Sequence, residues 1–284
     1  MPGVMWKKRR GRKGAFFDEE IAIPERLWYA SLYKRCWYMD TRKGEVRMGP
    51  ILLGHLNLLI YFVVAVILAF GWRILFPIPQ EVFRKTLHFV LLGSFFVLIV
   101  SYPTWVSAAG TAIVFEILVY PILWFFERFR KYSEFTTERK AGELKHSLML
   151  VYTMFAVVVA VCWGIFEDRY LALASLYAWG FGDAAAALIG KKYGRHKIRA
   201  PGLDGKKSYE GTGAMFVVSW VSVFCLLMWR GGMNGAACGV ISFIVAGVSA
   251  VSELYSRGGN DTVICPMSAM AALLPLVYLF GGLS

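Results

Sequence analysis

Long apolar runs dominate this chain and restrict what it can fold into. Each run is close to the roughly 20 residues that a helix needs to cross the hydrocarbon core of a bilayer. Eight such runs are present, at about 51–71, 86–101, 105–126, 148–166, 171–190, 213–230, 236–252 and 263–281. Because the second and seventh runs are short, the sequence predicts an all-α, polytopic integral membrane protein with seven or eight transmembrane helices.

The charged residues gather between these runs. They make up 18% of the 284 residues, against about a quarter in a soluble domain. The five cysteines are scattered and form no CxxC pair, which disfavours a disulfide framework or a zinc site. The simplest partition is a transmembrane catalytic domain at 51–284 that follows a basic, aromatic tail at 1–50.

The tail holds 12 Lys and Arg residues against six acids. Its aromatic residues recur at i, i+4 spacing, which predicts a helix lying in the headgroup layer of an anionic lipid surface. A poorly ordered basic leader is the alternative. Nucleic-acid binding is not expected of a chain with such a membrane domain.

The basic residues of the connections are distributed unevenly. Those at 72–85, 127–147, 191–212 and 253–262 hold 17 Lys and Arg, whereas the alternate connections hold two. The positive-inside rule places the basic set, and with it an active site, on the cytoplasmic face. Strict alternation of eight helices would put the tail on the other side, so we expect one helix to be miscounted and the tail to be cytoplasmic.

Asp183 follows Gly182 in a predicted membrane helix, where an unpaired charge costs about 2.5–3.5 kcal/mol. A bound cation lowers that cost, and Mg²⁺ prefers one or two carboxylates together with phosphate oxygens. We therefore expect Asp183 to bind Mg²⁺. The alternative is a structural ion pair with Lys191 or Arg195.

A basic, glycine-rich loop follows at 190–207. Its glycines, which include Gly194 and Gly205, allow tight turns and a close approach of backbone to ligand. Its cations suit a polyphosphate, or else anchor lipid headgroups; they are Lys191, Lys192, Arg195, Lys197, Lys206 and Lys207. The GKKS at 205–208 is no P-loop, because the first glycine of that motif is missing and no strand precedes it.

The segment SYEGTG at 208–213 leads into the next predicted helix. Glu210 falls in or near its first turn, where an acid is favourable and where free N–H groups could also accept a phosphate. We expect a catalytic role for Glu210; a helix cap is the alternative.

The segment EVFRKTLH at 81–88 is the third polar cluster. If it is helical, Arg84 and His88 share a face. The cations Arg84 and Lys85 are then placed to clamp a phosphate, and His88 to move a proton. A structural role for an interfacial histidine is the alternative.

Two acids flank a Gly-Gly turn in the segment 252–266. Glu253 ends one predicted helix and Asp261 precedes the next. With Asp183 they would complete a metal or nucleotide site, whereas a solvated turn is the alternative. Glu116 lies in the middle of a membrane run and is a weaker functional candidate.

Together these clusters resemble the dolichol kinase, phytol kinase and CTP-dependent diacylglycerol kinase family. The pieces that carry the resemblance, in the family's order, are RKTLH (84–88), GDAAAALIGKKYGRHK (182–197), GKKSYEGTGAMF (205–216) and the E…ND…P pattern from Glu253 to Pro266. The resemblance implies transfer of the γ-phosphate of a nucleoside triphosphate, often CTP, to a membrane lipid alcohol. Phytol, a polyprenol, dolichol and diacylglycerol all remain open as acceptors.

The motif match also implies roles for particular residues. The best matched are Asp183, Lys206, Lys207, Ser208, Glu210 and Asp261. Asp183 and Asp261 are expected to hold Mg²⁺, and the lysines with the glycine-loop amides to hold the β- and γ-phosphates. The base could be Glu210, Glu253 or His88. Where the family often has Asp-Asn, this chain has Asp261-Thr262, so a base-reading role for that position is doubtful.

Two other functions remain open from the sequence. A phosphatidate cytidylyltransferase-like enzyme would use similar groups but would release pyrophosphate. An ion-coupled transporter would use Asp183 and Glu116 as relays, although the inverted repeats that many transporters have are not evident. The sequence leaves the oligomeric state open.

Overall fold

Eight long helices make up the part of the chain that the structure, a computed structural model, describes: residues 48–128, 142–199, 203, 205, 207–256 and 259–283. Each is long and apolar enough to cross a membrane. They are α2 (Met48–Leu75), α3 (Gln80–Ser101), α4 (Trp105–Phe126), α6 (Glu143–Val158) with its π-helical continuation η1 (Val159–Ile165), α7 (Arg169–Tyr193), α8 (Tyr209–Arg230), α9 (Gly235–Tyr255) and α10 (Asp261–Leu279). The predicted all-α, polytopic fold is confirmed, with eight helices. The tail helix and Lys206 lie outside the described residues.

The two short apolar runs become full-length helices because polar residues extend them. Helix α3 starts at Gln80, before the apolar run, so its first turns contain Glu81, Arg84 and Lys85. Helix α9 likewise continues to Tyr255 and includes Glu253. These candidate acids and cations therefore lie near the ends of membrane helices.

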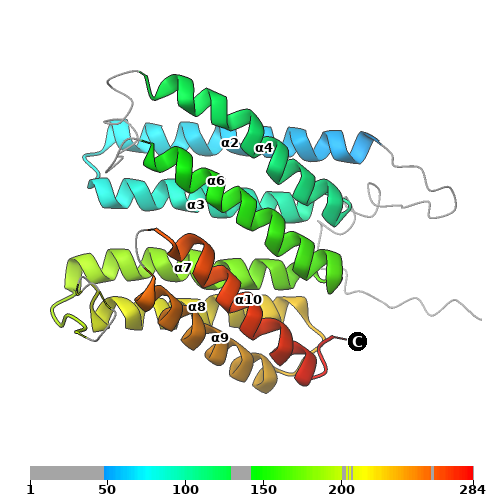
Figure 1. Cartoon of the computed structure of the whole chain (residues 1–284), viewed down its shortest axis with the longest axis vertical. Coiled ribbons are helices and arrows are strands. Elements are labelled where there is room, and N and C mark those ends of the chain that lie inside the picture. The colour runs from blue at the N-terminus through cyan, green and yellow to red at the C-terminus, as the bar shows by residue number, and fades with distance from the viewer. Residues whose placement is uncertain are drawn as a thin grey trace, which may run out of the picture. The chain divides into compact units, whose positions relative to one another are not determined.

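The helices form two groups of four. Figure 1 shows α2, α3, α4 and α6 in one group and α7 to α10 in the other. The groups meet where α3 packs on α7 and α6 packs on α10. Large apolar side chains on the outside, such as Leu52, Leu59 and Leu68 of α2, are exposed and suit a lipid environment.

Helix α7 lies against α3, α8 and α10. A side chain at Gly182 would bring a Cβ within 2.3 Å of Ser219 Oγ, and one at Gly180 would meet Leu92 at 2.3 Å. These glycines let the neighbouring helices approach α7 closely, as small residues do in membrane bundles. The close packing sets the position of Asp183, one residue after Gly182.

The polar helix ends meet at one end of the bundle. There α3, α8 and α10 begin, and α7 and α9 end. Figure 1 shows that helix α2, drawn in blue, begins at the opposite end. All eight described helices are long and apolar enough to cross a membrane, so the expected miscount gains no support from the structure. The tail itself lies outside the described residues.

Candidate active site

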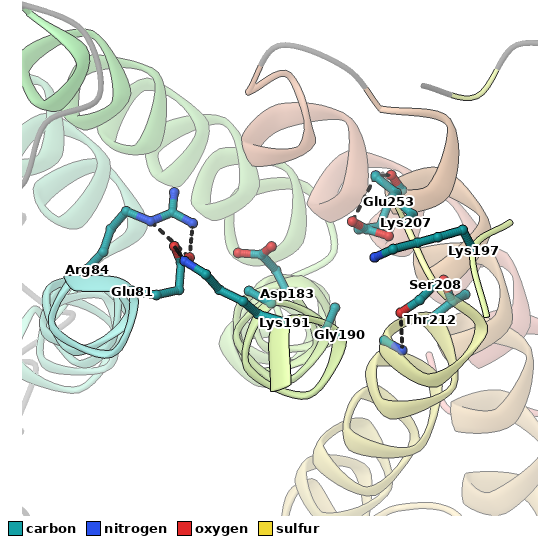
Figure 2. Close-up of a pocket in the computed structure, with 13 residues that line it drawn as sticks. Glu81, Arg84, Asp183, Gly190, Lys191, Lys197, Lys207, Ser208, Thr212 and Glu253 are labelled. Atoms are coloured by element: carbon teal, nitrogen blue, oxygen red, sulfur yellow. Dashed lines mark hydrogen bonds and ion pairs between the residues drawn. The ribbon is translucent and has the colours of Figure 1, made fainter. Parts of the chain in front are cut away.

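A cavity of about 450 Å³ opens at this polar end of the bundle. Its volume is in the range of small-molecule binding sites. Helices α3, α7, α8 and α9 and the loop between α7 and α8 form its wall, which Figure 2 shows. The lining residues are Glu81, Arg84, Asp183, Ala186, Ala187, Gly190, Lys191, Lys197, Lys207, Ser208, Gly211, Thr212 and Glu253.

Asp183 is paired across the α3–α7 interface. Lys85 Nζ donates to Asp183 Oδ2 at 2.6 Å, and the two side chains are only 7% and 14% exposed. The partner is thus Lys85, and not Lys191 or Arg195 as the structural alternative supposed. Lys85, expected at a phosphate, instead holds the carboxylate that was expected to bind the metal.

His88 lies on the same side of α3, one turn further along. Its Nε2 is 3.1 Å from the carbonyl oxygen of Gly180 and 3.9 Å from Asp183 Oδ2. Its ring meets the Trp179 ring edge-on, with centroids 5.0 Å apart. If Nε2 carries the proton, it donates a hydrogen bond to the Gly180 carbonyl. The ring is then held beside Asp183 and does not line the cavity.

Asp261 and Glu253 approach the same place from α10 and α9. The carboxylate of Asp261 interacts electrostatically with Asp183, Lys85 and Lys207. Glu253 Oε1 lies 2.8 Å from Lys207 Nζ, which also donates to the backbone carbonyl of Glu253 near the end of α9. The structure therefore brings together Asp183, Asp261 and Lys207, which are far apart in the sequence.

This arrangement bears on the expected magnesium ion. Within the described residues, no group of three or more His, Cys, Asp and Glu side chains is arranged to hold a metal ion. Two neighbouring carboxylates, Asp183 and Asp261, repel each other, and a cation would relieve that repulsion. Two carboxylates suit Mg²⁺ when phosphate oxygens supply further ligands, so these two acids are candidate ligands for a metal that binds together with a nucleotide.

Glu81 is a residue of the cavity that the sequence analysis did not assign. Its Oε1 accepts from Arg84 Nε at 3.2 Å and also from Arg84 Nη2. Its Oε2 accepts from Lys191 Nζ at 3.3 Å. Two cations expected to bind phosphate are thus held by one acid; the i, i+3 spacing of Glu81 and Arg84 was the signal available in the sequence.

The loop between α7 and α8 closes back on itself. Lys197 and Ser208 form an antiparallel bridge, and the N–H of Ile198 donates to the carbonyl of Lys207 at 3.0 Å. A Cβ at Gly194 would lie 2.2 Å from the carbonyl oxygen of Gly190. Only glycine therefore allows this close approach of the loop to the end of α7.

The first turn of α8 is occupied by the protein itself. Ser208 Oγ accepts from the N–H of Gly211 at 3.2 Å, and the N–H of Tyr209 donates to the carbonyl of His196 at 3.0 Å. The expectation that free N–H groups here accept a phosphate is therefore wrong for these two amides. Ser208 caps helix α8 and also lines the cavity.

Glu210 points to the loop and does not line the cavity. Its Oε1 accepts from the N–H groups of Arg195 and His196 at 3.3 and 3.2 Å, and lies 2.7 Å from His196 Nδ1. This position orders the loop backbone. The catalytic role expected of Glu210 gains no support from it.

The remaining predicted residues fall into two groups. Arg84, Lys191, Lys197, Lys207 and Ser208 line the cavity. Lys192 lies over the ring of Tyr193, 5.0 Å from its centroid, and Gly205 is exposed with a φ of +68°; neither lines the cavity. Glu116 accepts from Thr153 Oγ1 at 2.9 Å, between α4 and α6.

Thr212 is a second residue that the sequence analysis missed. It lines the cavity, and its buried Oγ1 has no hydrogen-bond partner within the described part of the chain. Most buried hydroxyls are paired, so this atom is a candidate contact to a ligand. Its only signal in the sequence was its place one turn after the Ser208 cap.

One curated relative resembles most of the chain. A phytol kinase from Synechocystis sp. (strain ATCC 27184 / PCC 6803 / Kazusa) is 28% identical over 221 residues, which cover 72% of this chain and 83% of the relative. No family model matches the chain, and no solved structure matches it. The similarity supports a phytol kinase and polyprenol kinase-like family for this protein.

Proposed function

We propose that this protein is a membrane lipid-alcohol kinase, which transfers the γ-phosphate of a nucleoside triphosphate, CTP first among them, to a phytol-like alcohol, a polyprenol or diacylglycerol. The observation that carries the proposal is the cavity in which Asp183 lies among cations from α3, α7 and the α7–α8 loop. The phytol kinase that the chain resembles supports the coarser assignment to lipid-alcohol kinases.

The charges of the cavity suit phosphoryl transfer, which depends mostly on positioning and on neutralising phosphate charge. Arg84, Lys191, Lys197 and Lys207 would bind the phosphate oxygens. Asp183 and Asp261 would hold Mg²⁺, which when bound neutralises charge on the β- and γ-phosphates. Lys85 orients the Asp183 carboxylate through their 2.6 Å contact.

The acceptor alcohol would come from the bilayer, because the cavity lies at the ends of membrane helices. Of the three residues considered as bases, Glu253 lines the cavity whereas Glu210 and His88 do not. We therefore assign to Glu253 the acceptance of the hydroxyl proton. The basic connections support a cytoplasmic location for this end of the bundle.

The test is a product analysis with purified protein in nanodiscs and Mg²⁺. CTP, UTP and ATP are each offered against phytol, a polyprenol, dolichol, diacylglycerol and phosphatidate, and both products are identified. A kinase yields a nucleoside diphosphate and a lipid monophosphate, and Asp183→Asn should abolish both. Pyrophosphate release with phosphatidate would instead indicate a CDP-lipid synthase. Ion flux into proteoliposomes without nucleotide turnover would indicate a transporter, and either result would overturn the proposal.

A further inference from the structure

Carboxylates of the cavity wall hold several of its cations. Glu253 pairs with Lys207 at 2.8 Å, and Glu81 pairs with both Arg84 and Lys191. Figure 2 shows the side chains of Arg84 and Lys191 turned toward Glu81. Glu81 is thus the acceptor for two cations at once.

The position of Glu81 makes it the fixed member of this group. It lies in the first turn of α3, while Lys191 lies in the last turn of α7. The Glu81 side chain is 11% exposed, against 35% for Arg84 and 68% for Lys191. Two flexible cations therefore reach from the solvent side to a largely buried acid.

We propose that Glu81 is a positioning residue that competes with phosphate: it holds Arg84 and Lys191 beside the cavity and yields them only to a polyphosphate. The inference rests on the proposed function, because it assumes a phosphate ligand in this cavity. Carboxylate and phosphate oxygens are alternative acceptors for the same guanidinium and ammonium groups. A phosphate bound there also lies close to the negative charge of Glu81, which opposes its binding.

This competition would provide selectivity at the membrane surface. The cavity lies where helix ends meet the headgroup layer, and lipid phosphodiesters there carry one negative charge each. A triphosphate carries several charges and contacts both cations together, so it displaces Glu81 more readily than a single phosphodiester does. Glu81 would thus keep anionic headgroups off Arg84 and Lys191 while the nucleotide site remains usable.

The test is the affinity for inorganic tripolyphosphate without metal, measured by calorimetry on protein in neutral phosphatidylcholine nanodiscs. Glu81→Gln keeps the shape of the side chain and removes its charge, so tripolyphosphate should bind about threefold to tenfold more tightly than to the unmodified protein. In nanodiscs containing phosphatidylglycerol, the variant should lose most of this gain, because headgroups now reach the two cations.

Glu127→Gln is the matched control. Glu127 is at the same end of the bundle, and its Oε2 pairs with Lys145 Nζ at 2.7 Å, yet it does not line the cavity. The same loss of charge should change tripolyphosphate affinity less than about twofold at moderate ionic strength. Adding Lys191→Gln to Glu81→Gln should remove part of the gain.

Unchanged or weaker tripolyphosphate binding by a folded Glu81→Gln protein would overturn the inference, as would an equal gain in Glu127→Gln. If Glu81→Gln does not fold, Glu81→Ala, which also removes the carboxylate, is tested in the same way. Because the readout is anion binding, tighter binding without any lipid phosphate product would reject the proposed kinase and keep this inference. If the protein is a kinase and Glu81→Gln leaves KM for the nucleotide unchanged, the inference about Glu81 is rejected and the proposed kinase is kept.

Discussion

At the scale of single residues, Asp183 and Lys85 form a buried ion pair, and removing either side chain destabilises the protein. Both side chains are largely buried, and removing one partner of a buried ion pair costs about 3–5 kcal/mol, because the other charge is left uncompensated. Each carries charge that the proposed chemistry needs. Replacing both residues should therefore restore stability without restoring activity.

We predict that Lys85→Met lowers the thermal stability of the protein in detergent, and that Lys85→Met/Asp183→Asn recovers most of the loss. Neither variant should have lipid kinase activity, because the carboxylate is unpaired in one and absent in the other. Thermal unfolding and the product assay measure the two effects. If Lys85→Met were as stable as the unmodified protein, the ion pair would be well solvated.

Thr212 gives a prediction that concerns binding alone. Its buried Oγ1 has no hydrogen-bond partner among the residues that the structure describes, so replacing it with an isosteric methyl group removes no hydrogen bond to them. We expect Thr212→Val to keep its thermal stability and to raise KM for the nucleotide about threefold to tenfold, the worth of one hydrogen bond. Thr212→Ser, which retains the hydroxyl, is the control, and equal kinetics in the two variants would contradict a ligand contact.

At the scale of elements, the junction of α7 and α8 positions the cavity wall. Helix α8 approaches α7 so closely that a Cβ on Gly211 would lie 3.0 Å from the carbonyl oxygen of Ala186. The loop then folds back over Gly194, next to Ser208. The cations of this loop are therefore placed by backbone contacts that leave little room for side chains.

Gly194→Ala should displace the loop, because its Cβ would lie 2.2 Å from the carbonyl oxygen of Gly190 and 2.5 Å from Ser208 Oγ. We expect a severe loss of kinase activity and a lower unfolding temperature. Gly213→Ala is the matched control, because nothing lies within 4 Å of its Cβ. It should stabilise α8 by about 0.5–1 kcal/mol, as alanine does in a helix; similar behaviour of the two variants would contradict the close approach.

The element scale also shows where the sequence pattern was incomplete. Hydrophobicity located every described helix but began α3 at 86, whereas the helix starts at Gln80. A hydrophobicity pattern misses the charged first turns of a helix, although the helical backbone includes them. Several of the residues that line the cavity lie in such turns, so the least hydrophobic parts of the helices contribute much of the candidate site.

At the scale of the whole molecule, the basic connections predict the orientation of the bundle in the membrane. Basic connections stay on the cytoplasmic side, so the end with the cavity should face the cytoplasm. In a protein whose native cysteines are replaced, Phe166→Cys should react with an impermeant maleimide added to intact cells. Lys192→Cys, at the end with the cavity, should react only after permeabilisation; the opposite pattern would invert the proposed orientation.

The sequence by itself determined the helical type of the fold, a count of seven or eight membrane spans, the bundle end that carries the basic connections, and several of the charged residues that line the cavity. These follow from properties that a short segment carries alone: its length, its hydrophobicity and its local motifs. Only the tertiary structure decided which charges meet. Asp183 contacts Lys85 across 98 residues of chain, and Glu81 contacts Lys191 across 110. Such pairs depend on how closely the helices pack, which glycines such as Gly182 permit but no local pattern encodes.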